Sequence, residues 1–198
     1  SRPVCDRGAT MTSRVPSTEA TPHALDLEAE LRRTIRDIPD FPKPGIVFKD
    51  ITPVLLDAAL FRRTIRAMAA PFASDGITHV AGIESRGFIL GAPIALELDA
   101  AFVPIRKPGK LPALVERVDY ALEYGIDALE VHRDALGSGQ RVLLVDDVLA
   151  TGGTAVAACE VIERLGAEVA GFTLLMVLSF LEGSKRLTGR RVRSLVTY

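Results

Sequence analysis

The segment from Arg141 to Gly153 constrains the fold of this chain more than any other. It reads RVLLVDDVLATGG, and its apolar residues Val142 to Val145 predict a strand that is buried on both faces, as in a parallel sheet. Asp146 and Asp147 follow where that strand ends, and after a glycine turn residues 155–165 favour a helix. A strand, an acidic pair, a glycine turn and a helix in this order predict a phosphate site with two carboxylates beside it.

The glycine turn, Ala150–Thr154, has the properties that a phosphate group needs. A helix start presents unpaired N–H groups and the positive end of the helix dipole, and Gly152 and Gly153 let the backbone approach closely. Thr151 and Thr154 add hydroxyl donors. Carboxylates repel phosphate and must bind hydroxyls or a metal on the same ligand, which describes a ribose phosphate. The string is neither a Walker motif nor GxGxxG, and a G-G or D-D pair alone would be typical of an ordinary loop.

Composition favours a single enzyme domain without a nucleic-acid or membrane partner. A chain of 198 residues can bury a sizeable core, and its formal net charge of −1 provides no basic field for nucleic acid. The most apolar stretch, residues 169–181, is too short to cross a bilayer. Cys5 and Cys159 form no disulfide framework, which favours a reducing cytoplasm. Residues 1–21 are rich in Ser, Thr and Pro, so we expect a disordered tail, with Met11 as a natural start, before one domain over residues 22–198.

Helical and extended patterns alternate along the rest of the chain. Apolar spacing predicts a helix from Leu27 to Ile38 that Pro39 closes. An irregular segment over 42–48 comes next, and then a helix with Asp57 as N-cap whose inward-facing residues are Leu60, Phe61, Ile65, Met68 and Phe72. A strand over 78–83 is followed by a helix over 88–98 that is apolar nearly all round and hence buried. We then expect a strand over 101–105, a long loop over 106–118 and a β-hairpin over 120–132 around Gly125. This alternation predicts a parallel α/β sheet with its ligand at the carboxyl ends of strands.

Four cations outside the glycine turn are candidate anion ligands. Arg106, Lys107 and Lys110 lie on the predicted loop, where they can close over a diphosphate and exclude water. Arg86 stands in the sequence ESRG at a second strand-to-helix turn, beside backbone N–H groups. The alternative for each is a solvated surface residue. The three histidines lack partners at metal-ligand spacing and are interpreted as structural.

Five segments resemble, in order and spacing, those of the type I phosphoribosyltransferases that act on adenine. They are FPKPGIVFKDITPVL (41–55), AGIESRGF (81–88), IRKPGKLP (105–112), LEYG (122–125) and VDDVLATGGT (145–154). The resemblance covers the chain from Leu25 to Tyr198. It implies a mostly parallel twisted sheet flanked by helices, with a small N-terminal hood and a flexible β-hairpin loop. It also implies that the phosphoribosyl group of phosphoribosyl diphosphate (PRPP) passes to adenine, giving AMP and diphosphate, in a cytoplasmic homodimer of purine salvage.

The same resemblance implies a role for each site residue. The glycine turn would hold the 5′-phosphate, and Asp146 and Asp147 would address the ribose hydroxyls. The diphosphate would be held at Ser85, Arg86, Lys107 and Lys110, with Arg106 reaching in from the partner subunit. Adenine would lie between Phe48, which is next to Val47, and Val148. Glu123, next to Tyr124, would be the catalytic acid or base near the purine. Mg²⁺ would be bound mainly through PRPP or diphosphate, so no protein ligand is named. The peptide bond before Ser85 would be cis.

Two other functions stay open at this point. One is a phosphoribosyltransferase for guanine, xanthine or orotate, which would differ in the base pocket. The other is a PRPP-sensing regulator that keeps the binding site and lacks catalysis.

Overall fold

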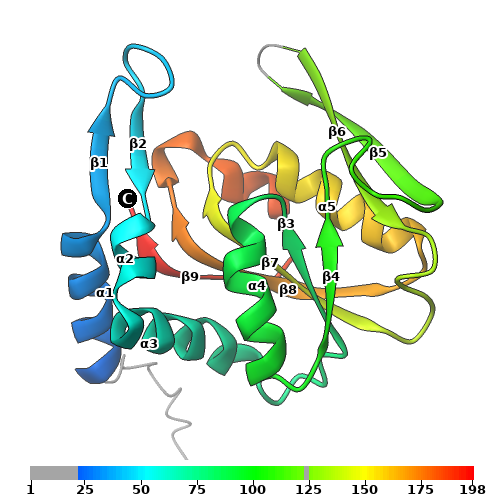
Figure 1. Ribbon diagram of the computed structural model, residues 1–198, viewed down its shortest axis with the longest axis horizontal. Coiled ribbons are helices and arrows are strands. Elements are labelled where there is room, and N and C mark those ends of the chain that lie inside the picture. The colour runs from blue at the N-terminus through cyan, green and yellow to red at the C-terminus, as the bar shows by residue number, and fades with distance from the viewer. Residues whose placement is uncertain (1–21, 123–124) are drawn as a thin grey trace, which may run out of the picture.

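A central sheet of parallel strands organises the chain (Figure 1). The computed structural model describes residues 22–122 and 125–198. The sheet contains, in spatial order, β4 (Ala101–Ile105), β3 (His79–Ile83), β7 (Arg141–Leu149), β8 (Glu168–Val177) and β9 (Val192–Thr197). Each strand runs parallel to its neighbours. The predicted parallel α/β sheet is therefore confirmed.

Helices cover both faces of this sheet because its central strand is apolar on both sides. In β7, Val142 and Leu144 pack in the cluster that contains α5 (Gly153–Arg164), whereas Leu143 and Val145 pack in the cluster that contains α3 (Ala58–Ala69) and α4 (Arg86–Glu97). This alternation is the period of two that a strand imposes. Short 3₁₀ helices complete the described chain: η1 (Ala70–Phe72), η2 (Ser179–Leu181) and η3 (Gly183–Leu187).

The second predicted helix begins where the sequence indicates. The Asp57 side chain accepts hydrogen bonds from the backbone N–H groups of Ala59 and Leu60, both at 2.9 Å, and so caps α3. Leu60, Ile65 and Met68 of that helix are buried against the sheet.

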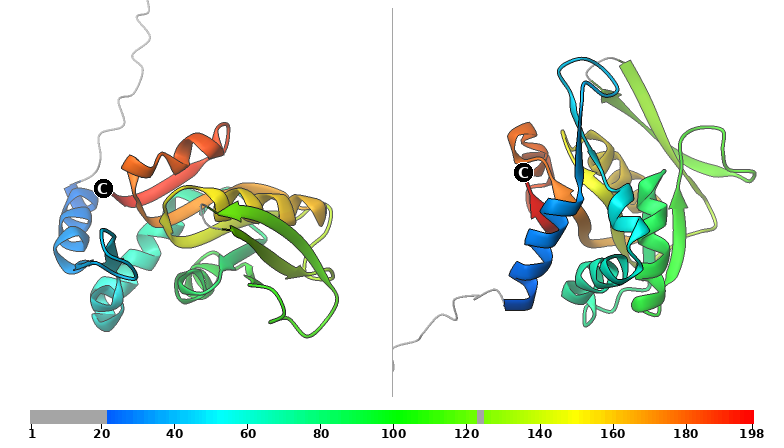
Figure 2. Two further views of the ribbon diagram at one scale, coloured as in Figure 1. Left: turned by 90° about the horizontal axis from the view of Figure 1, so that it is seen from above. Right: turned by 60° about the vertical axis from the view of Figure 1, so that its left-hand side comes forward.

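The N-terminal hood consists of α1 (Pro22–Thr34), β1 (Arg36–Pro39), β2 (Val47–Asp50) and α2 (Thr52–Leu56), and it stands beside the sheet (Figure 2). The helix predicted to reach Ile38 is wrong at its end, since the chain becomes extended at Arg36. A residue before proline is disfavoured in helical conformation, which applies to Ile38. Ile38 pairs instead with Phe48 across an antiparallel hairpin, so the segment over 42–48 is only partly irregular.

A second hairpin, β5 (Val115–Leu122) and β6 (Gly125–His132), lies over α5 and beyond the edge of the sheet. The loop predicted to run to Val118 is too long, because pairing begins at Val115 opposite His132. Val118 of β5 is buried in the core cluster that contains α5, and this burial favours a strand over a loop. Glu123 and Tyr124 lie outside the described residues.

The helix predicted to be buried all round, α4, is buried on one face only. Leu90 and Ile94 lie in the core, whereas Leu96 is 83% exposed and Ile89 44% exposed. The helix approaches β3 closely at Gly82 and Gly91, where an added Cβ would lie 2.9 Å from the Phe102 ring. Its outer face therefore presents apolar side chains to solvent. No helix in the described part of the chain is both long and apolar enough to cross a membrane.

Candidate functional site

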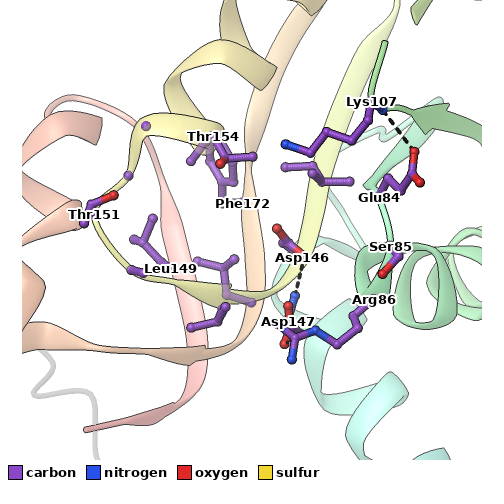
Figure 3. A pocket seen from close by; sticks show the side chains of 17 residues that line it. Glu84, Ser85, Arg86, Lys107, Asp146, Asp147, Leu149, Thr151, Thr154 and Phe172 are labelled. Carbon is purple, nitrogen blue, oxygen red and sulfur yellow. Dashed lines mark hydrogen bonds and ion pairs between the residues drawn. The ribbon is translucent and has the colours of Figure 1, made fainter. Parts of the chain in front are cut away.

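A pocket of about 300 Å³ opens at the carboxyl ends of β3 and β7 (Figure 3). The glycine turn forms one side of it, and Glu84, Arg86 and Lys107 form the opposite side. Asp146 and Asp147 lie between the two sides. The structure thus brings together the acidic pair, the glycine turn and two of the predicted cations in one cavity.

The glycine turn has an open helix start. Gly152 caps α5 with a φ of 83°, a left-handed conformation that favours glycine. Its side is closed by η3, because a Cβ at Gly152 would lie 2.7 Å from the carbonyl oxygen of Gly183. No side chain caps α5, so the first N–H groups of this helix are left for an anion.

In the acidic pair, Asp147 is buried and Asp146 half-buried, and their hydrogen bonding is incomplete. The backbone N–H of Asp147 donates to Oδ1 of Asp146 at 2.9 Å. Arg86 Nε lies 3.0 Å from Asp147 Oδ2, but without the direction of a hydrogen bond, so that oxygen has an ion-pair partner and no hydrogen-bond partner. Burial, with the neighbouring Asp147 charge, raises the pKa of Asp146 well above its ordinary value. Burial also raises the pKa of Asp147, although the charge of Arg86 opposes this shift.

Lys107 is held at the pocket rim by two residues of the β5–β6 hairpin. Its ammonium donates to the Tyr120 hydroxyl at 2.7 Å and forms an ion pair with Asp127. The Tyr120 hydroxyl also donates to Asp127 at 3.1 Å and accepts from Thr154 Oγ1 at 3.3 Å, which connects the hairpin to the glycine turn. Burial lowers the pKa of Lys107, but the hydrogen bonds to Asp127 and Tyr120 outweigh it and raise the pKa.

Glu84 forms hydrogen bonds and ion pairs with the cationic residues of the segment that follows β4. Its carboxylate accepts from the backbone N–H of Lys107 at 3.0 Å, lies 3.3 Å from Arg106 Nε and forms an ion pair with Lys110. Burial raises the pKa of Glu84, but these contacts, led by Lys110, lower it overall. Arg106 and Lys110 are paired with Glu84 in this way and are not among the residues that line the pocket. The peptide bond between Glu84 and Ser85 is cis, as the resemblance implies, and Ser85 lines the pocket.

Of the residues expected around adenine, Val148 is the one that lines the described pocket. Phe48 reaches it from the hood through Arg86, whose guanidinium carbon lies 4.8 Å from the Phe48 ring centroid. Val47 is 51% exposed and takes no part in the described pocket. Glu123 and Tyr124 lie outside the described residues.

Three residues of the site escaped sequence reasoning: Glu84, Tyr120 and Asp127. Tyr120 and Asp127 face each other in the hairpin register. The pairing register of the two strands is the signal that would have brought these two residues together. Among the described residues, no three His, Cys, Asp or Glu side chains converge as a metal site.

Comparison with known proteins agrees with this geometry. Residues 55–192 match the family described as phosphoribosyl transferase domain, and this range holds the whole pocket lining. The fold and the site thus define a phosphoribosyltransferase.

The relatives narrow this class. The chain is 59% identical over 186 residues to the adenine phosphoribosyltransferase of Myxococcus xanthus, with 93% of this chain and 98% of the relative covered. It is 50% identical to the Rhodothermus marinus enzyme of that name, whose crystal structure aligns with a TM-score of 0.85 over 88% of this chain and 99% of the other. The Saccharomyces cerevisiae enzyme, crystallised with an imino-altritol bisphosphate and adenine, is 37% identical, with a TM-score of 0.82 over 86% of this chain and 99% of the other. This chain belongs to the adenine phosphoribosyltransferase family.

The raised pKa of Asp146 predicts opposite effects of one substitution on stability and binding. A carboxyl whose pKa is higher in the folded state than in the unfolded state favours folding below the unfolded pKa, and that contribution is lost as pH rises through the folded pKa. We expect Asp146→Asn to raise the melting temperature of the ligand-free protein near pH 8 and to change it little near about pH 4. We expect the same variant to bind PRPP about tenfold or more weakly, because a charge-assisted hydrogen bond is lost. Thermal unfolding and calorimetry measure the two effects.

Asp134→Asn is the matched control, because Asp134 is an exposed carboxylate outside the pocket. It should change neither quantity. A melting temperature of Asp146→Asn that falls near pH 8, or unchanged PRPP affinity, contradicts the assignment.

Proposed function

We propose that this protein transfers the phosphoribosyl group of PRPP to adenine and releases AMP and diphosphate. The observation that carries the proposal is the arrangement across one pocket. An open helix start lies on one side, cations lie on the other, and buried carboxylates lie between them. PRPP has its 5′-phosphate, its ribose hydroxyls and its diphosphate in the same order. The yeast relative, crystallised with adenine, supports the choice of base.

The roles of the residues follow from this match. The glycine turn binds the 5′-phosphate through backbone N–H groups, and Asp146 and Asp147 bind the ribose hydroxyls. Arg86 and Lys107 bind the diphosphate beside Ser85. Lys110 joins them only after its ion pair with Glu84 is broken. The base lies between Phe48 and Val148, which we call the base slot.

A magnesium ion fits this donor set. The carboxylate oxygens of the acidic pair are hard ligands, and Asp147 Oδ2 is buried without a hydrogen-bond partner. Asp146 and Asp147 would hold the water ligands of an ion that is bound mainly to PRPP oxygens. When bound, the ion supplies positive charge that stabilises the departing diphosphate.

The protein's own groups have two tasks in the reaction. The bond from the anomeric carbon to the diphosphate breaks as purine nitrogen nine attacks, so positive charge develops on the sugar and negative charge on the leaving group. Arg86 and Lys107 hold that leaving group and orient it. Glu123 exchanges a proton with the purine, a role that rests on the family resemblance. Conversion of a free purine base to AMP is a purine salvage step. The buried free thiol of Cys159 supports a reducing, cytoplasmic location.

An assay with several bases tests this proposal. We expect PRPP-dependent formation of AMP from adenine, followed by absorbance, and no product from guanine or xanthine at the same enzyme concentration. Binding of PRPP without conversion of any base would favour a regulator and contradict the proposal. Conversion of another base in preference to adenine would contradict the specificity.

Glu123→Gln tests the proton carrier. Glutamine keeps the size and the hydrogen bonding of glutamate but cannot ionise, so turnover should fall by about 10²–10⁴-fold with little change in PRPP affinity. Glu116→Gln, in the same hairpin but outside the pocket lining, should keep wild-type turnover. Unchanged turnover of Glu123→Gln from about pH 6 to pH 9 would restrict Glu123 to positioning.

The homodimer belongs to the same proposal, and the outer face of α3 and α4 supports it. A groove of about 520 Å³ there is lined by the apolar residues Leu55, Ala58, Phe61, Ile65, Pro93 and Leu96, with Arg62, Arg66 and Glu97 at its rim. Exposed apolar patches of this kind mark protein interfaces. Arg66 and Glu97 lie 3.6 Å apart within the chain, and this exposed pair can exchange partners across a two-fold axis, as a self-complementary interface requires. Arg106 packs over Phe88 at the start of α4, and in such a dimer it would reach the partner's site.

Leu96→Glu tests this interface, since it places a charge on the most exposed part of the groove. We expect the mass measured by light scattering to fall from that of a dimer to 21.3 kDa. Phe180→Glu, at an exposed apolar residue of η2, should remain dimeric. A dimeric Leu96→Glu protein would rule out this face.

A further inference from the structure

Arg86 contacts two groups that come from different parts of the fold. Its Nε lies 3.0 Å from Oδ2 of Asp147 at the end of β7. Its guanidinium carbon lies 4.8 Å from the centroid of the Phe48 ring, which belongs to the hood strand β2. Figure 3 shows the side chain extended from the start of α4 toward Asp147. One cation thus spans the space between the hood and the sheet.

This position conflicts with substrate binding. A planar base that stacks on Phe48 needs a free ring face, and the guanidinium of Arg86 covers one face. The edge contact of Phe41, with ring centroids 5.2 Å apart, further limits access to the ring. Asp147 Oδ2 needs a hydroxyl donor but faces the same arginine. Arg86 therefore covers one face of the Phe48 ring and contacts the Asp147 carboxylate at the same time.

We propose that Arg86 couples the two substrate sites: in the free protein it closes the base slot, and the diphosphate group draws it off Phe48 and Asp147. This inference rests on the proposed function, because it uses the diphosphate and adenine sites named there. It adds a second role to Arg86, that of a gate whose position reports whether the anion site is filled.

The contacts of Arg86 make this exchange favourable. Its ion pair with Asp147 lacks hydrogen-bond direction, and its contact with Phe48 is a cation–π contact. A diphosphate offers the guanidinium paired oxygens in bidentate geometry, which is a stronger interaction than either. Asp147, freed of the arginine, can then accept from a ribose hydroxyl. Coupling between binding sites is reciprocal, so adenine must strengthen diphosphate binding by the same factor.

Lys107 provides a matched control within the same pocket. It is also a pocket cation held by a carboxylate, but its partners are Asp127 and Tyr120, and no contact joins it to Phe48 in the described structure. Removing Lys107 should weaken diphosphate binding and leave the base slot unchanged. Only Arg86 should affect both sites.

Calorimetry of adenine binding, alone and with saturating magnesium diphosphate, tests the inference. In the wild-type protein we expect diphosphate to tighten adenine binding by about 5–150-fold. In Arg86→Ala we expect adenine alone to bind more tightly than to the wild type, with no further gain from diphosphate. In Lys107→Ala, more diphosphate should be needed to saturate the protein, but saturating diphosphate should still tighten adenine binding.

The sign of the effect decides the outcome. If Arg86 is only a ligand or a structural residue, its removal lowers adenine affinity or leaves it unchanged, and either result overturns the inference. Arg86→Gln, which keeps polarity and much of the length, should behave like Arg86→Ala and replaces it if the alanine variant melts early. If the wild-type protein converts adenine to AMP but diphosphate does not tighten its adenine binding, the role of Arg86 as a gate is overturned and the proposed function stays intact. Wild-type protein that binds adenine in no state overturns the proposed function as well.

Discussion

The desolvation of two adjacent carboxylates is the constraint on which the rest of the site depends. Asp146 and Asp147 lie in the carboxyl-terminal part of the central strand of a sheet covered on both faces, where Asp147 is buried and Asp146 half-buried, so water cannot solvate them fully. Such groups are costly unless they are paired or protonated. Within the protein, Asp146 has one backbone N–H and Asp147 has one ion pair without hydrogen-bond direction. In the proposed function, the hydroxyl groups of the ribose supply hydrogen bonds that these carboxylates lack in the free protein.

The cations of the site show the complementary arrangement. Each one assigned to the diphosphate already has a carboxylate partner: Asp147 for Arg86, Asp127 for Lys107 and Glu84 for Lys110. These pairs keep positive side chains close to the pocket without leaving them unpaired. In the proposed function, an incoming diphosphate displaces these carboxylates, because two phosphates carry more charge in a better geometry than separate side chains do.

The sequence predicted the part of the site that is contiguous and not the part that depends on register. The acidic pair and the glycine turn stand within one strand–turn–helix unit, so local rules suffice for them. Tyr120 and Asp127 become neighbours only when the hairpin pairs in one register. Glu84 follows β3 and contacts cations that follow β4, so this contact depends on the pairing of those two strands. Ile38 fits a helical spacing equally well, and the following proline decides against it. The prediction that α4 is buried all round was wrong for another reason. An apolar helix can be covered by a second copy of the chain as well as by its own core.

The base slot is the least locally determined feature, because Phe48, Arg86 and Asp147 come from the hood, α4 and β7. The hood is fastened to the sheet at Tyr198, whose ring lies under Lys49 and Arg32. Arg32 also donates to the backbone carbonyl of Thr197 at the end of β9. The glycine turn is held differently, by η3 beside Gly152 and by the hydrogen bond from Thr154 to Tyr120 of the β5–β6 hairpin. In the proposed function, recognition of the phosphate and the ribose therefore depends on β7, α5 and these neighbours, whereas recognition of the base depends on the separate contact between the hood and the sheet.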